Sequence, residues 1–315
     1  MNRWLSFAAV LTLLAVARPA VGQDFTLTTS TSTGVILGMS KELVYDTGYK
    51  LSELDWPLLP AVYLGAAVDL KTKIGFLASI ELQTAIPGRN GTMTDSDFLN
   101  YDDVKTHYSE SDSYMERVII VNLQAGWAIP LQSGGAVSLL APFLGFEYMQ
   151  FKWTARDGYL QYPPETSSPY TPWSPSTTKT PIYGTGIIYT QNYYIPMAGI
   201  KSTVRLLDNL TMSLSLAFSP YVWCSNVDEH IFRSLNFYDD PRGGVMLEPW
   251  LSMAYRIAPQ ATLTLDARYR HIASLLGDTY IVATGISGAK SPPYTNSAGA
   301  SFDAVNVSLA FSLSF

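Results

Sequence analysis

Two short motifs carry the residue types that could activate a water molecule. One is Asp95-Ser96-Asp97 and the other is Asp228-Glu229-His230. In each motif the two chemically useful side chains are two positions apart, and on a β-strand such positions face the same side. If strand geometry holds there, one wall presents two carboxylates and another wall presents a carboxylate with an imidazole. Together these groups could hold one water between them and remove its proton.

Other interpretations of these residues stay open. The chain has three histidines, His107, His230 and His271, and a histidine beside an aspartate is often only a solvated ion pair. Three carboxylates and one imidazole could also bind a divalent metal, since oxygen ligands suit calcium or magnesium and mixed ligand sets suit zinc. No further liganding motif accompanies them in the sequence, so we expect no metal and no cofactor.

The composition indicates that much of the molecular surface does not face water. Of the 315 residues, 47% are hydrophobic and only 15% are charged, whereas ordinary globular chains have about 25% charged residues. The net charge of −6 would repel a phosphate backbone, so we expect no nucleic-acid partner. Disorder is disfavoured because disordered chains are rich in charge and poor in aromatic residues. Cys224 is the single cysteine, which excludes an intramolecular disulfide.

The N-terminus predicts export. Arg3 precedes an apolar run over residues 4–16, and Ala20-Val21-Gly22 then offers small residues for cleavage. This pattern is typical of a secretory signal peptide, and the run is shorter than the about 20 residues that a transmembrane helix needs. We therefore predict a signal peptide over residues 1–22 and a single domain over residues 23–315. An uncleaved membrane anchor is the alternative.

The rest of the chain contains alternating segments that predict lipid-facing strands. Over residues 304–315 the pattern has period two, with apolar side chains at odd positions and small or polar ones at even positions. Similar runs begin at Ile119, Leu210 and Leu263. A transmembrane barrel strand needs one lipid-facing side and one polar side over about ten residues. A soluble β-sandwich or a solenoid is the alternative.

Short turns and long polar connections alternate along the chain and give the strand count. Short turn signals occur near residues 71–72, 132–135, 208–209 and 258–260, and longer polar segments cover residues 43–54, 87–114, 157–184, 226–241 and 276–299. This alternation predicts an all-β fold, a ten-stranded antiparallel transmembrane β-barrel with both termini at the short-turn end. In bacterial outer-membrane barrels the long loops face the exterior. Both motifs are therefore expected at the extracellular mouth, on the cell surface.

Five short stretches, at residues 41–45, 51–56, 95–98, 154–156 and 228–230, resemble the omptin family of outer-membrane aspartate/histidine endopeptidases. Their order and intervals extend the resemblance over nearly the whole mature chain. The resemblance implies a barrel that projects above the membrane with a proteolytic groove at its top. It also implies that the catalytic residues of this hydrolase are Asp95, Asp97, Asp228 and His230.

Water is the expected nucleophile of this protease. His230 would accept the proton of the water, and Asp228 would orient the ring and stabilise the imidazolium that forms. Asp95 would hold the water from the opposite side, while Asp97 would support Asp95 or the developing tetrahedral species by sharing a proton. Because two close carboxylates cannot both ionise freely, one pKa of the aspartate pair should be raised.

The resemblance also implies substrate-binding residues, and here the chain departs from the family pattern. Glu42 matches a glutamate that would pair with an arginine or lysine before the scissile bond. Asn226 stands where the family has a second acid, and His107 stands at a further acidic position beyond the cut. We therefore expect cationic peptide or protein substrates with weaker selectivity for paired basic residues. A shift of the alignment by one or two residues is the alternative.

The same resemblance bears on lipid. Omptins bind lipopolysaccharide, which activates them, through a Tyr, Glu and Arg cluster outside the barrel, whereas the matching positions here are Phe146, Tyr148 and Gln150. None of these can pair with a phosphate as arginine does. Either the organism has a different outer leaflet or the protein uses Lys152 and Arg156 instead. We expect a monomer surrounded by outer-membrane lipid.

Two other functions stay open from the sequence. One is an outer-membrane adhesin or surface-interaction protein with weak or no protease activity. The other is a small porin, which ten strands disfavour because side chains largely fill so narrow a lumen.

Overall fold

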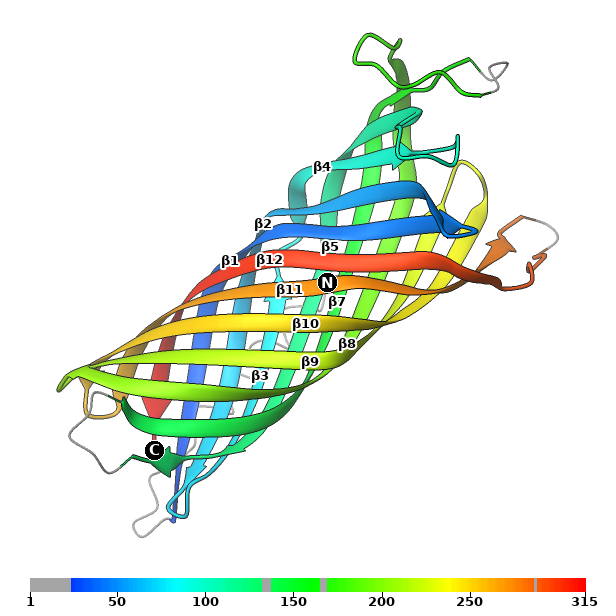
Figure 1. The fold of residues 1–315 in the computed structure, drawn as a ribbon. Coiled ribbons are helices and arrows are strands. Elements are labelled where there is room, and N and C mark those ends of the chain that lie inside the picture. The colour runs from blue at the N-terminus through cyan, green and yellow to red at the C-terminus, as the bar shows by residue number, and fades with distance from the viewer. Residues whose placement is uncertain (1–23, 132–136, 165–168, 286–287) are drawn as a thin grey trace.

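The structure is a closed β-barrel. The computed structural model describes residues 24–131, 137–164, 169–285 and 288–315, so the predicted signal peptide lies outside the described residues. In these ranges a single antiparallel sheet curves round into a ring (Figure 1). No helix in the described ranges is long and apolar enough to cross a membrane. The strand segments are β1 (Phe25–Asp46), β2 (Tyr49–Thr72), β3 (Phe76–Ala85), β4 (Gly88–Asp97), β5 (His107–Trp127), β6 (Ile129–Pro130), β7 (Val137–Gln161), β8 (Thr180–Leu207), β9 (Leu210–His230), β10 (Leu235–Ala258), β11 (Ala261–Ala283) and β12 (Tyr294–Ser314).

These segments form the ten strands that the sequence predicts. β3 and β4 follow one path, because both pair with β2 on one side and with β5 on the other. The path is interrupted next to Pro87, whose nitrogen cannot donate to a strand ladder. β6 continues β5 against β7, and β1 pairs with β12 to close the ring. The predicted all-β barrel is therefore confirmed.

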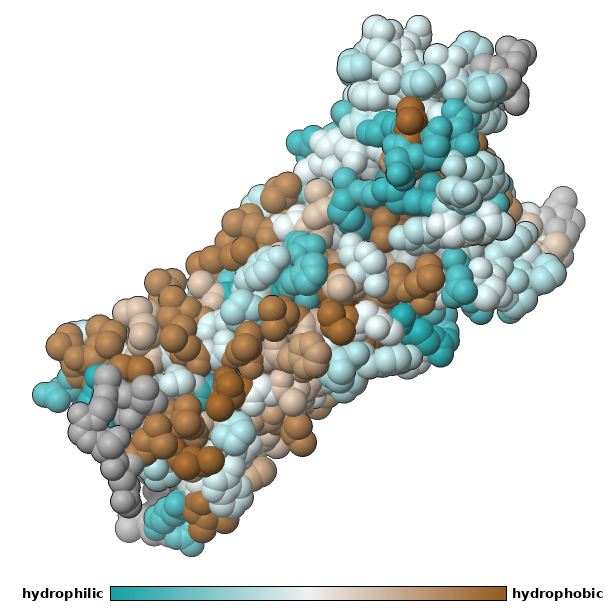
Figure 2. Space-filling view, viewed as in Figure 1, coloured by the Kyte–Doolittle hydropathy of each residue, from teal (hydrophilic) through white to brown (hydrophobic). Residues whose placement is uncertain are grey.

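One end of the barrel has an apolar outer face. Figure 2 shows hydrophobic residues gathered over the lower part of the barrel and hydrophilic residues over the opposite end. β12 explains the pattern, because Val305, Val307 and Leu309 are exposed while Ala304 is buried. The apolar end also carries the two described termini, where the Phe315 amide donates to the carbonyl of Leu27. An apolar outer band is what a barrel needs in order to face lipid.

The strands are much longer than a membrane requires. β7 has 25 residues and β8 has 28, whereas about 9–11 residues cross a bilayer. The strands therefore continue past the lipid and build the hydrophilic extension (Figure 2). This corrects the predicted long connections, since strands occupy most of residues 43–54 and 226–241.

The first hairpin shows why strand residues were predicted to belong to long connections. β1 and β2 are joined by Thr47 and Gly48 alone, with φ of 49° and 88°. Two successive positive φ values are the mark of a type I′ hairpin turn, which suits the twist of the flanking strands. Above the lipid both faces of a strand can be polar, so the alternation of hydropathy that reveals a lipid-facing strand is lost.

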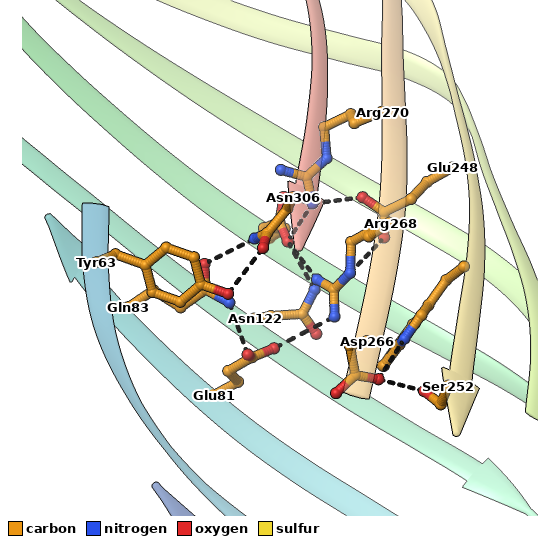
Figure 3. A network of polar contacts seen from close by, with 12 residues as sticks. Tyr63, Glu81, Gln83, Asn122, Glu248, Ser252, Asp266, Arg268, Arg270 and Asn306 are labelled. Atoms are coloured by element: carbon orange, nitrogen blue, oxygen red, sulfur yellow. Dashed lines mark hydrogen bonds and ion pairs between the residues drawn. The ribbon is translucent and has the colours of Figure 1, made fainter. Parts of the chain in front are cut away.

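A charged network lies inside the barrel (Figure 3). Arg270 contacts Glu147 at 2.7 Å and Glu248 at 2.5 Å. Arg268 lies 3.5 Å from Glu81 and 3.6 Å from Glu248. The cavity beside the two arginines measures about 10 Å³, roughly the space of one water molecule. A lumen filled in this way disfavours the porin alternative.

An aromatic layer lies above this network, toward the mouth. The rings of Trp56 and Tyr189 stack with centroids 5.0 Å apart, and Trp153 lies 5.8 Å from Trp56. Phe151 continues the layer at 5.4 Å from Trp153. All four side chains are fully buried. Because the indole of Trp56 also donates to Glu42, this layer is the floor of the polar mouth.

Candidate active site

The barrel brings the two sequence motifs to facing walls of its mouth. Asp95 lies on β4, and His230 ends β9. Around the ring, β5, β7 and β8 separate these strands on one side, and β2, β1, β12, β11 and β10 separate them on the other. Both side chains nevertheless line one pocket of about 220 Å³. A small molecule in that pocket can therefore contact groups from both walls.

His230 is held by a carboxylate and an aromatic ring. Its Nε2 lies 2.5 Å from Oδ2 of Asp228, which is only 2% exposed. Phe237 packs edge-on against the imidazole with the ring centroids 5.0 Å apart. When Nε2 donates to Asp228, Nδ1 becomes the acceptor nitrogen of the neutral ring. The arrangement is that of a general base oriented by a buried acid.

The aspartate pair lies on the inward face of β4. Ser52 of β2 donates a hydrogen bond of 2.9 Å to Oδ1 of Asp95. Burial and then the negative charge of Asp97 raise the pKa of Asp95 to about 7, although the Ser52 hydrogen bond acts in the opposite direction. Burial also raises the pKa of Asp97. The pKa of Asp95 is thus raised as predicted, but burial contributes more to the shift than the repulsion from Asp97 that the spacing suggested.

Glu42 lies at the bottom of the mouth on β1. It is 3% exposed, and the indole nitrogen of Trp56 donates to its Oε2 at 3.3 Å. Burial raises its pKa well above the ordinary value, and the nearby charges of Asp228 and Asp239 raise it further. Carboxylates crowded together in a buried place favour the approach of a cation, because a positive group offsets both the desolvation and the repulsion.

Asn226, where the resemblance led us to expect a second acid, has an acidic neighbour that the sequence did not single out. Asp239 of β10 lies opposite Asn226 of β9 and opposite Thr279 of β11. It is 8% exposed, and burial raises its pKa to about 7, with Asp228 adding to the effect. Residues 226 and 239 are equally far from the turn at residues 231–234. Their pairing can therefore be predicted only if both strands are assumed to extend to that turn.

His107 begins β5 and is packed among aromatic rings. Its ring centroid lies 4.8 Å from that of Tyr162 and 5.0 Å from that of Tyr170, and its Nδ1 lies 2.9 Å from the hydroxyl of Thr106. Burial lowers the pKa of His107, which favours the neutral ring. Its role in substrate binding stays a prediction, as does that of Asn226, which accepts a hydrogen bond from the thiol of Cys224.

The positions that matched the lipid-binding cluster lie on β7. Phe146 is 40% exposed, while Tyr148 and Gln150 each donate to Oδ1 of Asn192 at 2.8 Å. These contacts are between neutral groups. Among the described residues, no group of three or more His, Cys, Asp or Glu side chains is placed to hold a metal ion. The expected absence of a cofactor stays a prediction.

Comparison with known proteins gives a consistent result. The profile of the Omptin family matches residues 23–315. The plasminogen activator of Yersinia pestis is 24% identical over 296 residues, covering 89% of this chain and 90% of that protein. The outer membrane protease OmpP of Escherichia coli K12 is 25% identical over 264 residues, covering 80% and 79%. The crystal structure of the outer membrane protease OmpT from Escherichia coli is similar with a TM-score of 0.82 at 18% identity, covering 94% of this chain and 99% of that one.

Proposed function

Because the chain belongs to the omptin family, we propose that it is an endopeptidase that cleaves peptide bonds next to basic residues. The family and the barrel fold support the function of a protease in the outer membrane, with the barrel mouth facing the exterior. One observation carries the proposed catalytic arrangement, namely the pocket that Asp95 and His230 share although they come from facing walls. A substrate carbonyl and a water in that pocket would lie between a carboxylate and a base.

The proposed reaction uses the side chains of both walls. Nδ1 of His230 accepts a proton from the water as the water oxygen attacks the carbonyl carbon, and Asp228 stabilises the imidazolium. Asp95, in its carboxylate form, accepts a hydrogen bond from the second O–H of the water and so directs the attack, and this hydrogen stays on the attacking oxygen. Asp97 supports Asp95 or the developing tetrahedral species by sharing a proton. The proton on His230 then passes to the leaving nitrogen, and the C–N bond breaks.

The preference for a cation follows from the acids below the scissile bond. Glu42 is buried beside Asp228 and Asp239, and their repulsion contributes to its raised pKa. Oδ1 of Asp228 is buried and has no hydrogen-bond partner in the described part of the chain. An arginine or lysine side chain would supply both the positive charge and the N–H donors that these oxygens lack.

The test is to replace His230 by alanine in the mature protein folded in detergent. We expect the cleavage rate of peptides that contain one arginine or lysine to fall by about 10² to 10⁴, the range for loss of a general base. His271→Ala is the matched control, because His271 also contacts an acid, Asp303 at 2.7 Å, but its side chain is 45% exposed and does not line the pocket. A cleavage rate that is unchanged in His230→Ala would remove this residue from the mechanism.

A further inference from the structure

The pocket beside the proposed catalytic groups lies on the side of the mouth away from Glu42. Its wall residues come from β4, β5, β7, β8 and the segments that follow β7 and β9. Glu42 lies on β1, which belongs to the other arc of the ring between β4 and β9. A line from Asp95 to His230 therefore separates the pocket from the acids around Glu42.

The lining of this pocket is mainly apolar. Six large side chains form most of its wall, namely Met93, Leu160, Tyr162, Ile182, Ile187 and Phe232. The polar contributors are Ser109 and Ser111 of β5 and Arg233 of the turn after β9, in addition to Asp95 and His230. The one cationic group, Arg233, repels a basic side chain, and aliphatic walls cannot solvate a charge.

The volume of the pocket matches one apolar side chain. It measures about 220 Å³, whereas an engineered cavity of about 150 Å³ is enough to bind benzene. A leucine or phenylalanine side chain therefore fits. Moving such a side chain out of water favours the bound substrate by about 10- to 100-fold relative to glycine at the same position.

We propose that this pocket is a binding subsite for an aliphatic or aromatic side chain, so that the enzyme selects a bond with a basic residue on one side and an apolar residue on the other. The proposal rests on the proposed peptidase function and deepens it. In an extended peptide, neighbouring side chains point in opposite directions. A scissile bond held between Asp95 and His230 would thus send one flanking side chain toward Glu42 and the other into the apolar pocket.

The experiment profiles cleavage of a peptide library by mass spectrometry. Each peptide carries one arginine, and the residue across the scissile bond is varied. For the wild-type protein folded in detergent, we expect leucine, isoleucine and phenylalanine to exceed glycine, lysine and glutamate by about 10- to 100-fold in kcat/KM. Leu160→Glu should shift the preference at that position toward lysine and arginine. Tyr183→Ala is the control, because Tyr183 is 79% exposed and does not line the pocket.

The outcomes separate the subsite from the proposed function. Cleavage that requires His230 but is indifferent to the varied residue, or prefers lysine or glutamate there, would overturn the subsite and leave the peptidase standing. No cleavage of any library peptide by folded protein would overturn the proposed function itself. If Leu160→Glu does not fold, Leu160→Ala tests the same wall, since a larger pocket should favour tryptophan and phenylalanine over leucine.

Discussion

Replacing Ser52 by alanine should raise the pH at which the enzyme becomes active. In the proposed mechanism Asp95 acts as a carboxylate, so kcat/KM should rise with pH through the pKa of Asp95, which is about 7. The hydroxyl of Ser52 donates to that carboxylate at 2.9 Å and lowers its pKa. A hydrogen bond to a charged group contributes about 1.5–3 kcal/mol, which corresponds to about 1–2 pKa units. Because the contact is only partly buried, we expect the lower value, a shift of about 1 unit to higher pH.

The assay is the pH profile of kcat/KM for one basic peptide, measured for wild type, Ser52→Ala and Ser96→Ala. Ser96 lies between the two aspartates but alternates with them along β4, so its loss should leave the profile in place. If the rising limb reports a group near Asp95 that Ser52 does not contact, protonation of Asp95 would remove a negative charge from its surroundings and move the limb to lower pH. Ser52 also lowers the pKa of Asp97, so a shift to higher pH assigns the limb to the aspartate pair. A limb that stays in place or moves down in Ser52→Ala would refute the assignment to Asp95.

Three further results are expected. Glu42→Gln should reduce the preference for arginine over citrulline by about 10- to 100-fold in paired peptides; an unchanged ratio would place cation binding elsewhere. Arg270→Met leaves two buried glutamates without this partner and should lower the free energy of unfolding in detergent by about 3–5 kcal/mol. The control Arg242→Met removes an exposed ion pair and should lower that free energy by less than about 1 kcal/mol. Since Gln150 and its contacts are neutral, adding lipopolysaccharide should leave the cleavage rate unchanged, and activation would contradict this.

The parts of the fold that sequence could predict are those where lipid and interior differ in polarity. Along β12, the exposed Val305, Val307 and Leu309 alternate with smaller residues over the full lipid-facing length. That contrast is enforced by the membrane itself, because a polar group facing hydrocarbon has no partner. The count of ten strands follows from these segments and the turns between them. The shared orientation of the two side chains within each motif could also be predicted, because positions two apart face the same side of any strand.

The parts that sequence could not predict depend on register between strands. Asp239 is a member of the buried acid cluster only because β9 and β10 pair with Asn226 opposite Asp239. Ser52 reaches Asp95 for a similar reason, since β2 and β4 place Ser52 opposite Asp97. A slip of one residue would turn these side chains to the outer face. Above the lipid both faces of a strand can be polar, so no regular hydropathy pattern fixes that register in advance.

The arginine and glutamate network of Figure 3 has a consequence for the cell that carries this protein. Packed side chains occupy the centre of the barrel between the site and the inner end, and the cavity beside Arg268 and Arg270 has room for roughly one water. Fragments released by the proposed cleavage at the mouth would therefore return to the surrounding medium.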